Sequence, residues 1–295
     1  MSARHKGYLW ALLATMAGST VYIFSKAALS QVSLPQFGVY WFSFAILWNG
    51  LYTVRSKEHR KFHPITRKSF RALVWIGLIE LVATGAFYAA IHSAANPAIP
   101  SFLRNMEYIF VTLMGVFLLR ERFTIKELAG VVLTFTGALV ISYNPQASFS
   151  SFFTGTSGLM MLSTVFYGFR TILAKNYIHQ ITPTILAINR AIYLLVFSLV
   201  LLASTGQGLT IPRLALINIA AGSFLGPFIT SISQYSALKY IEASRSAIIQ
   251  STTALFVLLG AYLIFGRFPA GYQLAGGALT IAGPMLMIIA KKLRA

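Results

Sequence analysis

The chain has 295 residues, of which 57% are hydrophobic and 10% charged, and its formal net charge is +18. A soluble protein of this length carries roughly a quarter charged residues, so this composition leaves too little polar surface for water and predicts a protein that lies in lipid. The positive charge is not gathered on one face and accompanies no nucleic-acid-binding motif, which argues against a nucleic-acid partner.

Long apolar stretches separated by short polar segments predict an all-α integral membrane protein of about ten membrane-spanning helices. The first stretch is longer than the apolar part of a signal peptide, which is about 7 to 15 residues, so we expect it to be a helix of the mature protein. Backbone groups in a bilayer must be paired within the span, which favours helices for the continuous stretches seen here. In chain order the predicted helices cover residues 8–30, 35–54, 72–94, 98–119, 127–143, 157–175, 184–204, 214–238, 246–265 and 270–290.

Lysine and arginine are concentrated in alternate loops, with 18 of the 24 on one side of the predicted membrane. The opposite side has only Lys26, Arg213 and Arg267, and three more lie inside predicted spans, Arg104, Arg170 and Arg190. Because loops rich in lysine and arginine stay in the cytoplasm, both termini are predicted to be cytoplasmic.

An internal repeat divides the chain into two halves, residues 1–145 and 155–295. The pattern L-A-G-x-x-L-T-x-x-G occurs from Leu128 to Gly137 and again from Leu274 to Gly283, at an offset of 146. Because a half with five helices crosses the membrane an odd number of times, the second half is expected to be inverted relative to the first. Inverted repeats suit alternating access around a central site.

The two five-helix halves, each ending in a polar turn and the repeated helix pattern, resemble the EamA-type drug/metabolite transporter superfamily. The element Pro183-x6-Arg190 is also similar to that family, although the matching first-half position is Phe42. Within the superfamily the sequence is similar to YddG-type exporters of aromatic amino acids. This resemblance implies a multi-pass protein of the bacterial inner membrane that exports small amphiphilic metabolites, aromatic amino acids above all.

Polar side chains inside the spans are the candidates for a substrate path, because each such group needs a partner or a wet cavity. Glu80 and Glu107 are candidates for a proton carrier or counter-charge. The predicted substrate-binding residues are Tyr88, His92, Arg104, Glu107, Tyr108, Tyr167, Arg170, Gln234, Tyr235 and Gln250.

Each candidate also has a structural interpretation. Glu80, Tyr88 and His92 are spaced to share a helix face, but the tyrosines could equally be packing or interfacial residues. Arg104 and Glu107, three residues apart, could neutralise each other, or Arg104 could bind a substrate carboxylate. Arg190 is expected to reach toward the cytoplasmic surface or to act in gating.

Other function classes find less support. The chain has no cysteine and no aspartate, and no constellation of nucleophile and base is recognisable, so we expect neither an enzyme nor a metal or cofactor site. The expected partners are a small-molecule substrate and the lipid bilayer. The alternatives are export of another metabolite or a cationic drug, with a glutamate as counter-charge, and a membrane scaffold or sensor without transport. The sequence does not indicate an oligomeric state.

Overall fold

The computed structural model describes residues 3–55, 66–119, 125–143, 153–177, 180–241, 246 and 249–292, and within these ranges the chain is helical, with no strand. The helices of the first half are α1 (Ala3–Leu29), α2 (Leu34–Arg55), α3 (Arg67–Ser93), α4 (Ala98–Leu103), α5 (Met106–Leu119) and α6 (Ile125–Ser142). Those of the second half are α7 (Gly155–Tyr177), α8 (Pro183–Ser204), α9 (Arg213–Ser223), the π-helix η2 (Phe224–Thr230), α10 (Ser231–Tyr240), α12 (Thr253–Phe265) and α13 (Gly271–Lys292).

Each range predicted from the sequence contains helix, but the span predicted for residues 98–119 is divided. After Leu103 the backbone N–H of Asn105 bonds Phe102 O at 3.1 Å, and that of Glu107 bonds Arg104 O at 3.0 Å. These bonds join residues three apart, which is the tighter 3₁₀ pattern. The turn places Arg104 and Asn105 between α4 and α5 instead of within one helix.

The span predicted for residues 214–238 is also irregular, because Pro227 lies inside it. Proline has no N–H to donate, and its ring obstructs the regular helical bond, so the residues around it form the π-helix η2. Side chains add hydrogen bonds to backbone carbonyls of this segment: Thr230 Oγ1 donates to Leu225 O at 2.8 Å, and Asn49 Nδ2 donates to Pro227 O at 3.2 Å.

Within the described residues, five helical segments are long and apolar enough to cross a membrane. They are His5–Leu29, Arg67–Ser93, Gly155–Ala174, Pro183–Ser204 and Arg213–Ala237. Large apolar side chains are exposed on the outside of the bundle, including Leu263 (70%), Ile264 (61%) and Trp75 (61%). So much exposed apolar surface is unusual for a soluble monomer and typical of a surface that faces lipid.

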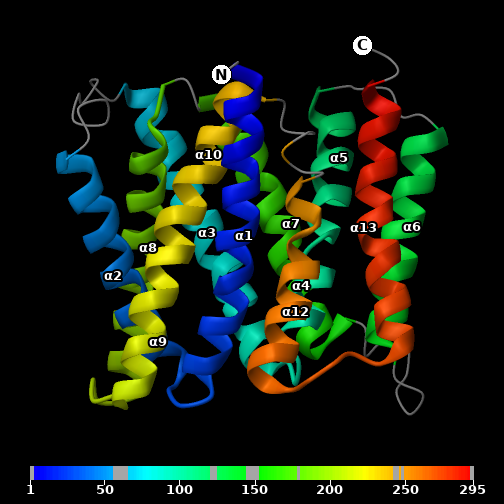
Figure 1. Ribbon diagram of the computed structural model, residues 1–295. Coiled ribbons are helices and arrows are strands. Elements are labelled where there is room, and N and C mark those ends of the chain that lie inside the picture. Colours follow the sequence, from blue (N-terminus) through cyan, green and yellow to red (C-terminus); the bar gives the residue numbers. More distant parts are fainter. Residues whose placement is uncertain are drawn as a thin grey trace.

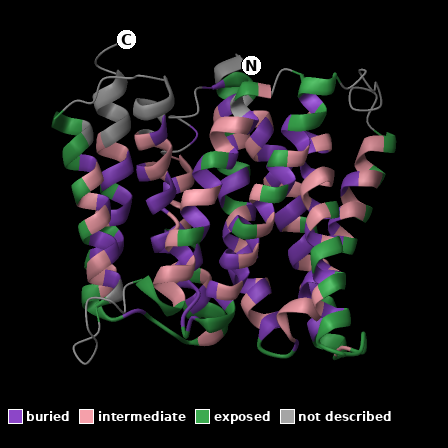
Figure 2. Ribbon diagram, turned by 180° about the vertical axis from the view of Figure 1, so that it is seen from behind, coloured by how far each residue is buried: buried purple, intermediate pink, exposed green. Residues whose placement is uncertain are grey.

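The helices stand roughly side by side, and α1 begins at the same end of the molecule at which α13 finishes (Figure 1). Helix α3 packs against α7 and α8, and α1 packs against α9, η2, α10 and α12. Figure 2 shows that buried residues lie where helices face one another, while exposed and half-buried residues cover the outward sides.

Helices α6 and α13 lie in backbone contact at one edge of the bundle (Figure 1). A Cβ atom added to Gly137 would lie 2.6 Å from Gly276 O, and one added to Gly283 would lie 2.6 Å from Gly130 O. The repeated pattern therefore supplies glycines where two antiparallel helices touch, a packing role that small residues serve in membranes. Gly222 and Gly226 have a similar packing role, because an added Cβ at either would lie 2.6 Å from an α1 side chain.

We predict that Gly137→Ala lowers the free energy of unfolding of the purified protein in detergent by about 1–3 kcal/mol, and with it the melting temperature. The added methyl group meets backbone atoms that cannot move aside. Gly50→Ala is the matched control, since no atom lies within 4 Å of its added Cβ. Equal melting temperatures for the two variants would contradict the packing described for α6 and α13.

Candidate functional site

The most buried charge in the described chain is Glu80, midway along α3 and fully inaccessible to solvent. Its Oε1 lies 3.2 Å from Nη1 of Arg170 on α7, and its Oε2 lies 3.1 Å from Nε of Arg190 on α8. A lone charge inside a membrane protein is costly, and each carboxylate oxygen here has its own guanidinium. Glu80 therefore joins three helices, one from the first half and two from the second.

Hydroxyl groups complete the surroundings of Glu80. Thr84, one turn further along α3, donates to Glu80 Oε2 at 2.6 Å and lies 2.9 Å from the Tyr167 hydroxyl. Arg190 Nη2 donates to Thr84 Oγ1 at 3.1 Å and to the Tyr167 hydroxyl at 3.4 Å. The guanidinium of Arg190 is thus held inside the bundle, and the expectation that it reaches toward the cytoplasmic surface is wrong.

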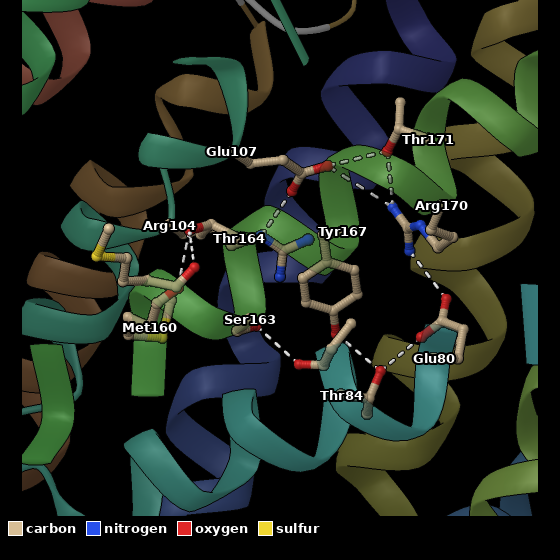
Figure 3. A network of polar contacts seen from close by, with 12 residues as sticks. Glu80, Thr84, Arg104, Glu107, Met160, Ser163, Thr164, Tyr167, Arg170 and Thr171 are labelled. Atoms are coloured by element: carbon tan, nitrogen blue, oxygen red, sulfur yellow. Dashed lines mark hydrogen bonds and ion pairs between the residues drawn. The ribbon is translucent and has the colours of Figure 1, made fainter. Parts of the chain in front are cut away.

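A second carboxylate, Glu107 on α5, extends this network (Figure 3). Its Oε2 accepts a hydrogen bond from Arg104 Nε at 2.9 Å, as the spacing of the two residues predicted. Its Oε1 accepts a hydrogen bond from Thr171 Oγ1 at 3.0 Å and lies 3.9 Å from Arg170 Nη2. Glu107 therefore bridges the turn before α5 and helix α7.

Together these residues form a chain of five alternating charges, Arg190, Glu80, Arg170, Glu107 and Arg104, which we call the charge chain. Three arginines and two glutamates leave one positive charge in excess. Arg104 and Arg190 are its two ends, and the Arg104 side chain is the more exposed, at 25% against 17%.

Aromatic rings surround the Arg104 end of the charge chain. The Arg104 guanidinium carbon lies 3.9 Å from the centre of the Tyr167 ring and 5.4 Å from that of Phe87. Phe87 packs edge-on against Tyr22 of α1, with ring centres 5.2 Å apart, and the Tyr22 hydroxyl faces Arg104. Cations over ring faces gain electrostatic attraction, most when desolvated.

Tyr88 and Tyr235 lie on either side of the charge chain along α3. The Tyr88 ring centre is 5.0 Å from that of Phe37 and 5.7 Å from that of Trp41, within a buried aromatic cluster. Tyr235 of α10 is buried with Leu73, Ile76 and Leu186, nearer the start of α3. Both tyrosines therefore pack in the core next to the ion pairs.

His92 does not share a site with Glu80. It is exposed at the end of α3, where its Nδ1 lies 3.2 Å from Leu29 O and Lys26 Nζ donates to its backbone oxygen at 2.9 Å. Glu80 and His92 therefore have different contacts, because they lie twelve residues apart along α3.

The remaining predicted residues are placed around the site. Tyr108 follows Glu107 on α5 and is half-buried, and Gln234 is half-buried on α10. Gln250 Nε2 donates to Ser246 Oγ at 2.7 Å, within its own segment. In the described part of the chain, no hydrogen bond joins these three side chains to the five charges.

The sequence analysis did not identify Thr84, Thr171 or Tyr22 as site residues. Hydroxyl residues are common in membrane helices, so their types alone give no signal; the informative sign for Thr84 is its position one turn after a buried glutamate. Among residues with described side chains, no group of three histidine, aspartate or glutamate residues is arranged to hold a metal ion.

A surface cavity of about 510 Å³ lies away from the charge chain, where the α3–α4 connection meets the α12–α13 connection. Arg267 Nη1 donates to Ala95 O at 2.6 Å, and Asn96 Nδ2 donates to Arg267 O at 3.3 Å. These bonds join the two halves at the end of the bundle opposite the start of α1.

Comparison with known proteins identifies the sequence family. The sequence profile of the EamA-like transporter family matches residues 5–143 and, separately, residues 156–289. A protein of Rhizobium johnstonii named riboflavin transporter is 25% identical over 300 residues, covering 96% of this chain and 90% of its own. An uncharacterized transporter of Archaeoglobus fulgidus is 24% identical over 233 residues, covering 74% of this chain and 80% of its own.

A solved crystal structure aligns with 100% of this chain and 99% of its own, with a TM-score of 0.69 and 13% sequence identity. At that identity the likeness shows the fold alone.

We predict that Glu80→Gln lowers the stability of the protein by about 3 kcal/mol, because it leaves Arg170 and Arg190 without a carboxylate in the interior. The double variant Glu80→Gln with Arg190→Gln removes one charge of each sign and should recover part of the loss. Thermal unfolding in detergent measures both. A Glu80→Gln variant as stable as the wild type would contradict the pairing described.

Proposed function

The chain belongs to the EamA-like transporter family, whose members are transporters and not enzymes, and we propose that it exports small amphiphilic metabolites, aromatic amino acids above all. In this proposal ten spans form two inverted five-helix repeats, residues 1–145 and 155–295, which alternate access to a central site. The protein lies in the bacterial inner membrane with both termini in the cytoplasm.

Two observations support the inverted repeat. The family profile matches each half separately. The glycine contacts between α6 and α13 are also reciprocal, because Gly130 touches Gly283 while Gly137 touches Gly276, and the offset of 146 converts one pair into the other. Such reciprocity is what a two-fold relation between equivalent surfaces produces.

Helix packing gives further support for this relation. The contact of α3 with α7 has a counterpart in that of α10 with α1, and the contact of α5 with α7 has one in that of α12 with α1. The turn at Arg104 and Asn105 likewise has a counterpart before α12, where Thr252 N bonds Ile249 O at 3.2 Å. Interrupted helices at matching positions of two repeats often mark a transporter's binding site.

The observation that carries the substrate proposal is the unmatched positive charge of the charge chain beside buried aromatic rings. An aromatic amino acid brings a carboxylate, which can pair with the fork of an arginine, and a ring, which can pack against Tyr167, Phe87 or Tyr22. A cationic drug is a poorer match, because the same site already has an excess of positive charge.

Riboflavin is a second candidate substrate, since the Rhizobium johnstonii relative is named a riboflavin transporter. Its flat ring system suits the same aromatic surroundings, but it has no carboxylate for Arg104. Competition between riboflavin and an aromatic amino acid therefore separates the two candidates.

We expect the purified protein, reconstituted in liposomes, to show saturable uptake of radiolabelled phenylalanine and tryptophan above that of leucine, because the proposed site combines an arginine with aromatic rings. Parallel series with and without a pH gradient measure whether a proton is coupled. Saturable uptake of labelled riboflavin with no amino-acid flux would transfer the proposal to flavins. Absence of flux for every solute, relative to protein-free liposomes, would transfer it to another metabolite or a cationic drug.

The proposed topology can be tested directly because the chain has no cysteine. Ser30→Cys, after α1, should react with a membrane-impermeant thiol reagent added outside intact cells, and Asn176→Cys, near the end of α7, should react only after the cells are opened. Both positions are exposed. The same response from both variants would contradict the inverted repeat, because the two residues lie at the carboxyl-terminal ends of equivalent helices.

A further inference from the structure

We infer that the ligand carries a carboxylate, and that this carboxylate displaces Glu107 from Arg104 and binds the guanidinium in its place. This inference rests on the proposed transport function for the existence of a small-molecule ligand. It does not depend on the ligand being an amino acid, and it adds the ligand group that binds Arg104 and a residue that determines specificity.

The charge balance points to one missing anion. Arg170 lies near both carboxylates, at 3.2 and 3.9 Å, while within the described residues each end of the charge chain has a single carboxylate partner. A desolvated cation without a full counter-charge is costly in a membrane interior. One added carboxylate brings the three arginines and their acidic partners to neutrality.

The Arg104 end is better suited to the added anion than the Arg190 end. Arg190 already donates to two hydroxyl groups, those of Thr84 and Tyr167, in addition to its pairing with Glu80. Arg104 bonds Glu107 through Nε, and its side chain is the most exposed of the three arginines. Its planar guanidinium, which also meets the Tyr22 hydroxyl, has the fork geometry suited to bidentate binding of a carboxylate.

A second, independent feature at this end is Asn105. Asn105 is buried, at 3% exposure, and its Nδ2 has no hydrogen-bond partner among the residues that the structure describes. A buried donor without an acceptor costs free energy, which a ligand oxygen could recover. Asn105 and Arg104 form the turn between α4 and α5, so both donors belong to one interruption of the helix.

Glu107 can leave Arg104 without becoming an isolated charge. Its other oxygen, Oε1, already accepts a hydrogen bond from Thr171 at 3.0 Å and lies 3.9 Å from Arg170. Exchange of one carboxylate for another on Arg104 therefore keeps every charge paired. A ligand without a carboxylate cannot make this exchange, because it would separate Arg104 from Glu107 and leave Arg104 without a negatively charged partner.

The test is isothermal titration calorimetry of the detergent-purified wild type and variants with two ligands. Phenylacetate has the carboxylate without the amine, and phenethylamine has the amine without the carboxylate. In Glu107→Gln the competing charge is absent and the amide keeps the side-chain shape. We expect this variant to bind phenylacetate at least about fivefold more tightly than the wild type, with no gain for phenethylamine.

Two further variants test the same geometry. Thr171→Val removes the hydroxyl that holds displaced Glu107, so it should weaken phenylacetate binding relative to the wild type. Arg104→Lys keeps the charge and loses the planar fork, so it should also weaken phenylacetate binding, even if Glu107→Gln proves too unstable to measure. Melting temperature and monodispersity of each variant verify folding.

Unchanged or weaker phenylacetate binding in folded Glu107→Gln would overturn the inference, as would equal phenylacetate affinity in wild type and Arg104→Lys. A panel of other monocarboxylates, aliphatic and aromatic, distinguishes failure of this inference from failure of the proposal that the substrate is an aromatic amino acid. If phenylalanine and tryptophan are not transported but another monocarboxylate binds more tightly to Glu107→Gln, aromatic amino acid export fails and the inference holds. If no carboxylate binds wild type or Glu107→Gln, the inference fails.

Discussion

The arrangement of the molecule depends on one constraint, the need to pair the buried carboxylate of Glu80. With no water around it, Glu80 requires both Arg170 and Arg190, and those residues lie on α7 and α8. Satisfying this one charge therefore fixes α3 against two helices of the other half. The hydroxyl groups of Thr84 and Tyr167 then complete the hydrogen bonding around the pair.

The same constraint has a consequence for movement between the halves. Both carboxylates of the charge chain come from the first half, while two of its arginines come from the second. Any motion of one half against the other must preserve these pairs or replace them, because separated charges in a membrane interior are expensive. A ligand that supplies its own carboxylate offers such a replacement, so its charge and the conformational change would be linked.

Local spacing made part of this site predictable. The ion pair of Arg104 with Glu107 follows from their separation by three residues. The pairs of Glu80 with Arg170 and Arg190 join residues 90 and 110 positions apart, and no helical period encodes such contacts. Because Arg190 lies close to a helix end, the sequence favours a side chain that reaches toward the cytoplasmic surface. In the structure it pairs instead with Glu80, a buried carboxylate on another helix.

The most direct test is a cryo-electron microscopy structure of the protein with a bound aromatic carboxylate such as phenylalanine. The account predicts the ligand carboxylate on Arg104, with Glu107 turned away toward Thr171 and Arg170 while Glu80 keeps both arginines. A ligand bound elsewhere, with the 2.9 Å contact between Arg104 and Glu107 intact, would contradict it.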